Sequence, residues 1–132
     1  MSVDNLMNQI KDLSFVSLED RDADWVGLCA AAALLMNKWQ IVRNDPSDLL
    51  PTGTIDVAGS TLEAEFWWSD RADAVQRVPP KTASHLVISV RPVGTMPVPR
   101  SLMDDLRSRL AKDIDKLKFG TVADLPFDAG PD

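Results

Sequence analysis

The sequence is poor in the side chains that most often build metal centres and disulfides. Its 132 residues include one His, one Cys and no Tyr, so one chain cannot supply a site with two imidazoles or several thiolates. Cys29 has no second cysteine with which to form a bond within the chain. A lone cysteine is typical of proteins in reducing compartments, and we expect a cytoplasmic location, no bound metal and no cofactor.

Positive charge is also scarce. Lys and Arg number 14 against 20 Asp and Glu, which gives a formal net charge of -6. Nucleic-acid binders usually carry a basic stripe, but the densest basic run here, Lys112 to Lys118, is interleaved with Asp113 and Asp115. The charge therefore argues against a nucleic-acid partner, and an acidic protein is better suited to a basic one.

Long apolar runs and nucleotide-binding motifs are missing as well. The longest apolar run, Trp25 to Met36, has twelve residues, whereas a membrane-spanning helix needs about 20. The N-terminus lacks the charge pattern of a secretory signal, and we expect no membrane association. The chain also has no phosphate-binding glycine loop and no G-x-S-x-G nucleophile motif.

Two helices are predicted in the first third of the chain. Apolar residues at helical spacing indicate a short amphipathic helix over residues 3–13. Ser17 and Asp20 match a capping box, which predicts a second helix from near Leu18 to a point within residues 37–43. Because this second helix is apolar on nearly all sides, we expect it to be central in the fold or paired with its copy in a dimer.

Alternating apolar and polar residues then predict three strands. Residues 54–57 and 61–68 alternate on either side of the glycine-containing turn 58–60, which is the pattern of a hairpin. Residues 85–91 form a third strand with its aliphatic side chains on one face. The segment 69–83 fits neither a helix nor a strand clearly.

The C-terminal third begins with the proline-rich connection 92–99. Ser101 and Asp104 repeat the capping pattern, and an apolar stripe predicts a helix that ends before Gly120. The acidic residues 121–132 are expected to form a loosely attached tail.

These elements predict an α+β fold in one domain over residues 1–120. It consists of two N-terminal helices, a three-stranded antiparallel sheet, and a C-terminal helix packed on the apolar face of the sheet.

The polar face of this sheet is the candidate site. Carboxylates beside an imidazole and a guanidinium are suited to general acid-base chemistry or to binding a polar ligand, with an indole as a stacking wall. The simpler interpretation is a solvated face whose opposite charges pair across strands. The side chains expected on this face are Asp56, Glu63, Glu65, Trp67, His85, Ser89 and Arg91, and the candidate binding residues among them are Glu63, Glu65, Trp67, His85 and Arg91.

Trp67 and Cys29 each need a separate explanation. Trp67 and Trp68 point to opposite faces of a strand, so one indole leaves the main core. Trp67 is then covered by residues 69–83, exposed as a ligand surface, or buried in an oligomer contact. Cys29 lies on an apolar helical stripe, where burial suppresses thiol reactivity, and we assign it a packing role and identify no catalytic residue.

The sequence leaves two hypotheses for function. The first is a small acidic, non-enzymatic module that binds a protein partner, of the chaperone, adaptor or inhibitor type. The alternative is a small ligand-binding domain or enzyme that uses the polar sheet face around Glu65 and His85.

Overall fold

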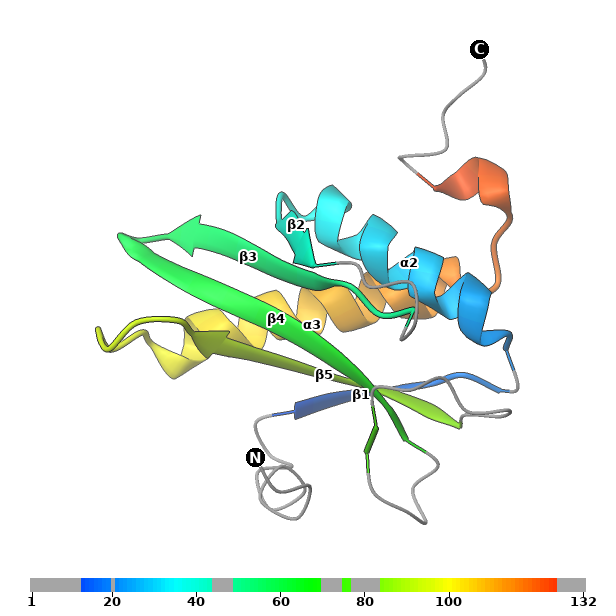
Figure 1. Ribbon diagram of the computed structural model, residues 1–132, viewed down its shortest axis with the longest axis horizontal. Helices are drawn as coiled ribbons and strands as arrows, with labels where there is room; N and C mark the ends of the chain where they lie inside the picture. Colours follow the sequence, from blue (N-terminus) through cyan, green and yellow to red (C-terminus); the bar gives the residue numbers. More distant parts are fainter. Residues whose placement is uncertain (1–12, 20, 44–48, 70–74, 77–83, 126–132) are drawn as a thin grey trace.

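The protein is built on one antiparallel sheet with strand order β1-β5-β4-β3-β2 (Figure 1). The computed structural model describes residues 13–19, 21–43, 49–69, 75–76 and 84–125. In chain order the elements are β1 (Leu13–Ser17), α2 (Ala23–Met36), β2 (Gln40–Arg43), β3 (Thr52–Val57), β4 (Ser60–Ser69), β5 (His85–Pro92), α3 (Arg100–Leu117) and the short 3-10 helix η2 (Val122–Asp124).

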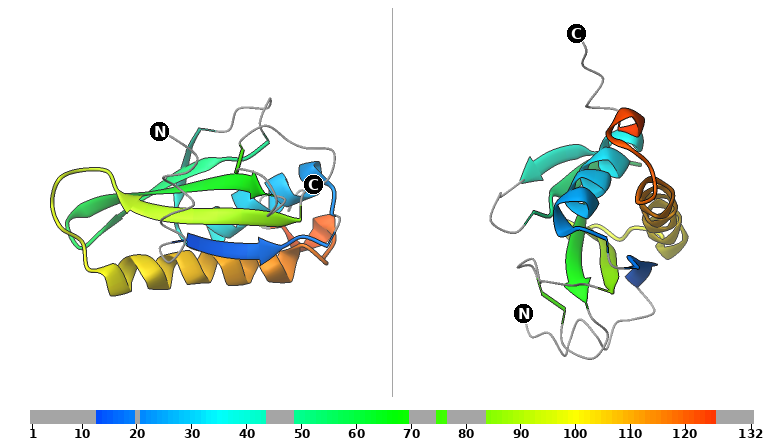
Figure 2. Two further views of the ribbon diagram at one scale, coloured as in Figure 1. Left: turned by 90° about the horizontal axis from the view of Figure 1, so that it is seen from below. Right: turned by 90° about the vertical axis from the view of Figure 1, so that its right-hand side faces the viewer.

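The two α-helices lie side by side on one face of the sheet (Figure 2). α3 packs over β1 and β5, and α2 packs beside α3 and leads directly into the edge strand β2. We call the covered side the helix face of the sheet and the opposite side the outer face. This two-layer arrangement buries the apolar side of each element against the others.

Alternation along the strands supplies the sheet's half of the core. Successive strand side chains point to opposite faces, so every second residue of β4 and β5 is directed at the helices. These residues are buried and belong to one core cluster with the inner sides of α2 and α3. The helix-face residues of β4 and β5 are Leu62, Ala64, Phe66, Trp68, Leu86, Ile88 and Val90.

Close contacts surround α2. The backbone of Leu49 crosses the helix at Gly27, where an added Cβ would lie 2.3 Å from the Leu49 carbonyl oxygen. On the α3 side, the Trp25 indole N–H donates to the Lys118 carbonyl at 3.0 Å. The sheet, α3 and the segment at Leu49 therefore explain why α2 is apolar on several sides at once.

The structure confirms the α+β class but corrects the predicted architecture, because the sheet has five strands and not three. β1 covers residues 13–17, so Leu13 begins a strand and does not end a helix, while the remainder of the predicted helix 3–13 lies outside the described residues. β2 covers residues 40–43, where the second helix was expected to end. Both additional strands lie at the sheet edges and are too short for their alternation to stand out.

Both predicted capping boxes are also wrong. α2 begins at Ala23 after Asp22, because Ser17 is still paired with His85 in the sheet. α3 begins at Arg100 after Pro99, and neither helix has a side-chain hydrogen bond at its N-cap. The hairpin, the third predicted strand and the helix that ends before Gly120 are confirmed.

Within the C-terminal segment expected to be a loose tail, Leu125 is buried in the main core. Residues 126–132 lie outside the described part of the chain.

Gly27→Ala tests the close approach of the Leu49 backbone to α2. The added methyl improves helix propensity by about 1 kcal/mol, but its overlap with a backbone carbonyl forces the helix or the connection to move. We expect a net loss of about 1–3 kcal/mol in the free energy of unfolding, measured by urea denaturation. Gly94→Ala is the matched control, because its Cβ meets nothing within 4 Å; equal stability of the two variants would contradict the packing at Gly27.

Candidate functional site

The outer face carries the side chains that the sequence singled out. In the β4–β5 register, Glu63 is opposite Arg91, Glu65 is opposite Ser89, and Trp67 is opposite Val87. Asp56 lies opposite Thr61 in the neighbouring pair of strands and accepts a hydrogen bond from its hydroxyl at 2.6 Å.

An ion pair lies diagonally across β4 and β5. The Arg91 guanidinium donates to a carboxylate oxygen of Glu65 at 2.5 Å, and the Arg91 side chain is 47% exposed. Exposed pairs of this kind contribute at most about 1 kcal/mol to folding. This contact agrees with the interpretation of a solvated face on which opposite charges pair across strands.

His85 lies at the other end of this face. Its Nδ1 is 3.1 Å from the Ser84 hydroxyl, and its ring meets Phe15 edge-on with centroids 6.4 Å apart. His85 is opposite Ser69, four positions along β4 from Glu65. At about 3.3 Å per residue this separation is on the order of 13 Å, whereas proton transfer needs contact directly or through one water. The structure therefore joins Glu65 to Arg91 but does not bring Glu65 and His85 together.

Trp67 belongs to a second apolar cluster on the outer face. Leu13, Val75 and Val87 are buried there, and Phe15 and Trp67 pack against them. Val75 is held in place because its neighbour Gln76 exchanges two backbone hydrogen bonds with Trp68, of 2.7 and 2.9 Å. Of the three explanations for Trp67, these contacts support cover by the chain that follows β4.

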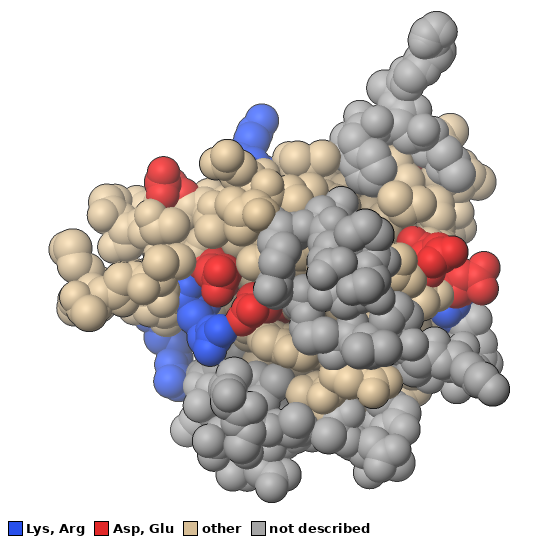
Figure 3. All heavy atoms as spheres, viewed as in Figure 1, with Lys and Arg blue, Asp and Glu red and all other residues tan. Residues whose placement is uncertain are grey.

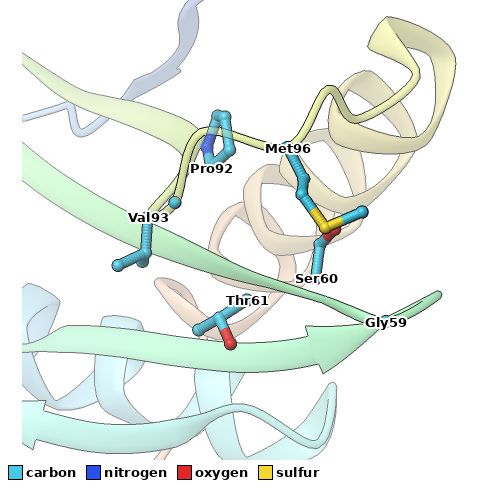
Figure 4. A pocket seen from close by; sticks show the side chains of 7 residues that line it. Gly59, Ser60, Thr61, Pro92, Val93 and Met96 are labelled. Atoms are coloured by element: carbon cyan, nitrogen blue, oxygen red, sulfur yellow. The ribbon is translucent and has the colours of Figure 1, made fainter.

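A surface pocket lies at the opposite end of the sheet from His85, where the β3–β4 turn meets the connection after β5 (Figure 4). The Val93 amide donates to the Thr61 carbonyl at 2.9 Å and holds the connection against β4. Val93 and Met96 are 59% and 64% exposed, although both are apolar. We call this hollow of about 260 Å³ the tip pocket; its lining residues are Gly59, Ser60, Thr61, Pro92, Val93, Gly94 and Met96.

Sequence reasoning missed the tip pocket. It treated residues 92–99 only as a stiff connection, although Val93 and Met96 are apolar residues among prolines, where no helix or strand accounts for them. Their proximity to Ser60 and Thr61 depends on the β4–β5 register, which the sequence pattern alone does not fix.

The thiol of Cys29 is fully buried in the main core. Desolvation raises the pKa of this thiol from 9.0 to about 11, so the neutral form predominates at neutral pH. This agrees with the packing role expected from the sequence.

Among the described residues, no group of three or more His, Cys, Asp or Glu side chains is placed to hold a metal ion. None of the helices in the same part of the chain is long and apolar enough to cross a membrane.

Comparisons of the chain with protein-family models, with curated proteins and with solved structures found no match.

Trp67→Ala tests the second cluster. Removing an indole that packs on Val75 and Val87 leaves a cavity, and we expect the free energy of unfolding to fall by about 2–4 kcal/mol. Glu65→Gln, on the same strand and face, removes only a surface ion pair and changes stability by less than about 1 kcal/mol. Urea denaturation measures both variants; a Trp67→Ala protein as stable as Glu65→Gln would contradict the packing of this indole.

The buried thiol predicts a specific pH dependence. The Cys29 thiol keeps its proton up to about pH 11 in the folded state, whereas in the unfolded chain it loses the proton near pH 9.0. The neutral buried thiol therefore contributes fully to stability below pH 9, and this contribution is lost as pH rises toward 11. The difference in the free energy of unfolding between the wild-type protein and Cys29→Ala, measured by urea denaturation at pH 8 and at pH 10.5, isolates this loss.

A thiol reagent tests the burial directly. At pH 8 it should modify Cys29 slowly in the folded protein and quickly in urea; equal rates would show that the thiol is accessible.

Proposed function

We propose that this protein is a non-enzymatic binding module for another protein and that the partner docks at the tip pocket. The observation that carries the proposal is the exposure of Val93 and Met96 around a hollow with two glycines in its lining. Apolar side chains that remain in water around a concavity are typical of protein interaction sites, and methionine adapts to varied partner surfaces.

The size and shape of the pocket suit a side chain of a partner protein. Small-molecule sites usually have volumes of about 300–1,000 Å³ and enclose most of their ligand. The tip pocket is smaller, and Met96 extends along its edge beside Ser60 (Figure 4). An apolar side chain presented by a partner would bury Val93 and Met96 together, as in the centre of a protein interface.

The surroundings of the pocket favour a basic partner segment. Arg91 directly precedes the pocket-lining Pro92 and is paired with Glu65. Asp56 and Glu63 lie on the adjoining strands and form no ion pair with a Lys or Arg among the described residues. Carboxylates at the rim and a net charge of -6 would steer a basic segment toward the site. The predicted binding residues Glu63, Glu65 and Arg91 would then form the polar rim.

The alternative function, a ligand site or enzyme around Glu65 and His85, gains less support from the geometry. Glu65 lies near the middle of β4 and His85 at the end of the outer face, four positions along the strand, and the His85 ring packs against Phe15.

Site-specific photo-cross-linking tests the proposal. A photoreactive amino acid replaces Met96 in the full chain, expressed in its native cells, and the matched control replaces Phe119, which is 54% exposed beyond the far end of α3. We expect one protein to be captured from position 96 and not from position 119. Met96→Asp should abolish co-purification of that protein and leave the melting temperature unchanged, because the side chain is mostly in water.

Capture of the same proteins from both positions would contradict the proposal. So would a partner whose co-purification survives Met96→Asp.

A further inference from the structure

Gly94 lines the tip pocket, and nothing in the described part of the chain requires a glycine at this position. Its φ is not positive, and a Cβ added there would meet no atom within 4 Å. A glycine lowers stability relative to alanine, because the unfolded chain has more freedom to lose. The other described glycines each have a structural reason, either a positive φ or a neighbouring atom that would overlap a Cβ: Gly27, Gly53, Gly59 and Gly120. A glycine without such a reason in the lining of a pocket points to the close approach of another molecule.

The backbone around Gly94 has hydrogen-bonding groups to offer. Val93 is already engaged, since its amide donates to the Thr61 carbonyl. The next three N–H groups, of Gly94, Thr95 and Met96, make no hydrogen bond with another described residue, and all three residues are exposed. A helix satisfies most of its own backbone groups, whereas an extended segment leaves its donors and acceptors available. The free groups at 94–96 therefore match an extended peptide segment.

The charges beside the pocket select a basic segment with an apolar side chain. The hydroxyl of Thr61, in the pocket lining, donates to Asp56 at 2.6 Å and holds this carboxylate beside the hollow. Within the described residues, Asp56 forms no ion pair with Lys or Arg. The outermost surface at this end of the molecule, on the left in Figure 3, is free of charged side chains. An occupant that matches both features carries an apolar residue next to Lys or Arg.

We propose that the occupant of the tip pocket is an extended segment of the partner protein, and that its main chain crosses the pocket at Gly94. This inference rests on the proposed function, because it names what docks at the same site. An apolar side chain of the segment lies between Val93 and Met96, and a neighbouring Lys or Arg pairs with Asp56. Residue 94 then determines what the pocket admits, because any side chain there occupies the path of the segment.

Peptide display supplies the probe for this proposal. A library of random short peptides is displayed on phage and selected on the full wild-type chain, and the most enriched peptide is synthesised with a fluorescent label. We expect enriched sequences to combine an apolar residue with a neighbouring Lys or Arg. Fluorescence anisotropy of the labelled peptide then gives the Kd for each variant of the chain.

Gly94→Leu should weaken binding of this peptide at least about tenfold, because the new side chain overlaps the path of the segment. Thr95→Leu is the matched control, since it places the same side chain on an exposed neighbour that does not line the pocket. It should change the Kd by less than about twofold. Both variants should keep the wild-type melting temperature. Asp56→Asn should weaken binding about two- to fivefold, as expected for an exposed ion pair.

Amide hydrogen exchange tests the backbone pairing. In the complex saturated with the peptide, at least one N–H group among Gly94, Thr95 and Met96 should exchange about tenfold or more slowly than in the free chain. Exchange at the free rate for all three amides would contradict pairing through the backbone.

The proposed function and the extended occupant fail through different results. A peptide that binds Met96→Asp and Gly94→Leu as tightly as the wild type would contradict the tip pocket as the docking site. Loss of binding to Met96→Asp, with equal binding to Gly94→Leu and Thr95→Leu, would keep the pocket and overturn the crossing at Gly94. The absence of any enriched peptide, when a partner is captured from position 96, would overturn an extended segment as the occupant.

Discussion

The burial of α2 is the constraint on which the rest of the structure depends. A helix that is apolar nearly all round cannot lie on a surface with only one side covered. The sheet covers one side of α2 and α3 covers a second side. On a third side the backbone at Leu49 crosses so close to the helix that only glycine fits at position 27. On the remaining side of α2, Leu28 and Leu35 stay partly exposed.

The outer face of the sheet is divided along its length. At the end near β1, Val87 is buried in a small cluster with Trp67 and Val75, which makes this end structural. Toward the other end, the Glu65–Arg91 pair is exposed and leads to the tip pocket. The same two strands, β4 and β5, therefore supply the core on one face and connect a packed region to a candidate binding region on the other.

Local patterns predicted the elements that are long enough for their pattern to repeat. The hairpin over residues 52–69 and the stripe of α3 are recognisable because alternation or helical spacing continues over enough residues. β1 and β2 have only five and four residues, and β1 pairs with β5 about 70 positions away, so their identity depends on contacts that no local pattern records. Alternation likewise assigned the candidate residues to one face, but only the register shows that Glu65 meets Arg91 and not His85.

The most direct test of the burial of α2 is native-state amide hydrogen exchange. The account predicts that the amides of the buried stretch from Cys29 to Leu34 exchange only when the whole protein unfolds, with a free energy equal to that from urea denaturation. Exchange of these amides at a free energy well below that of global unfolding would contradict the account.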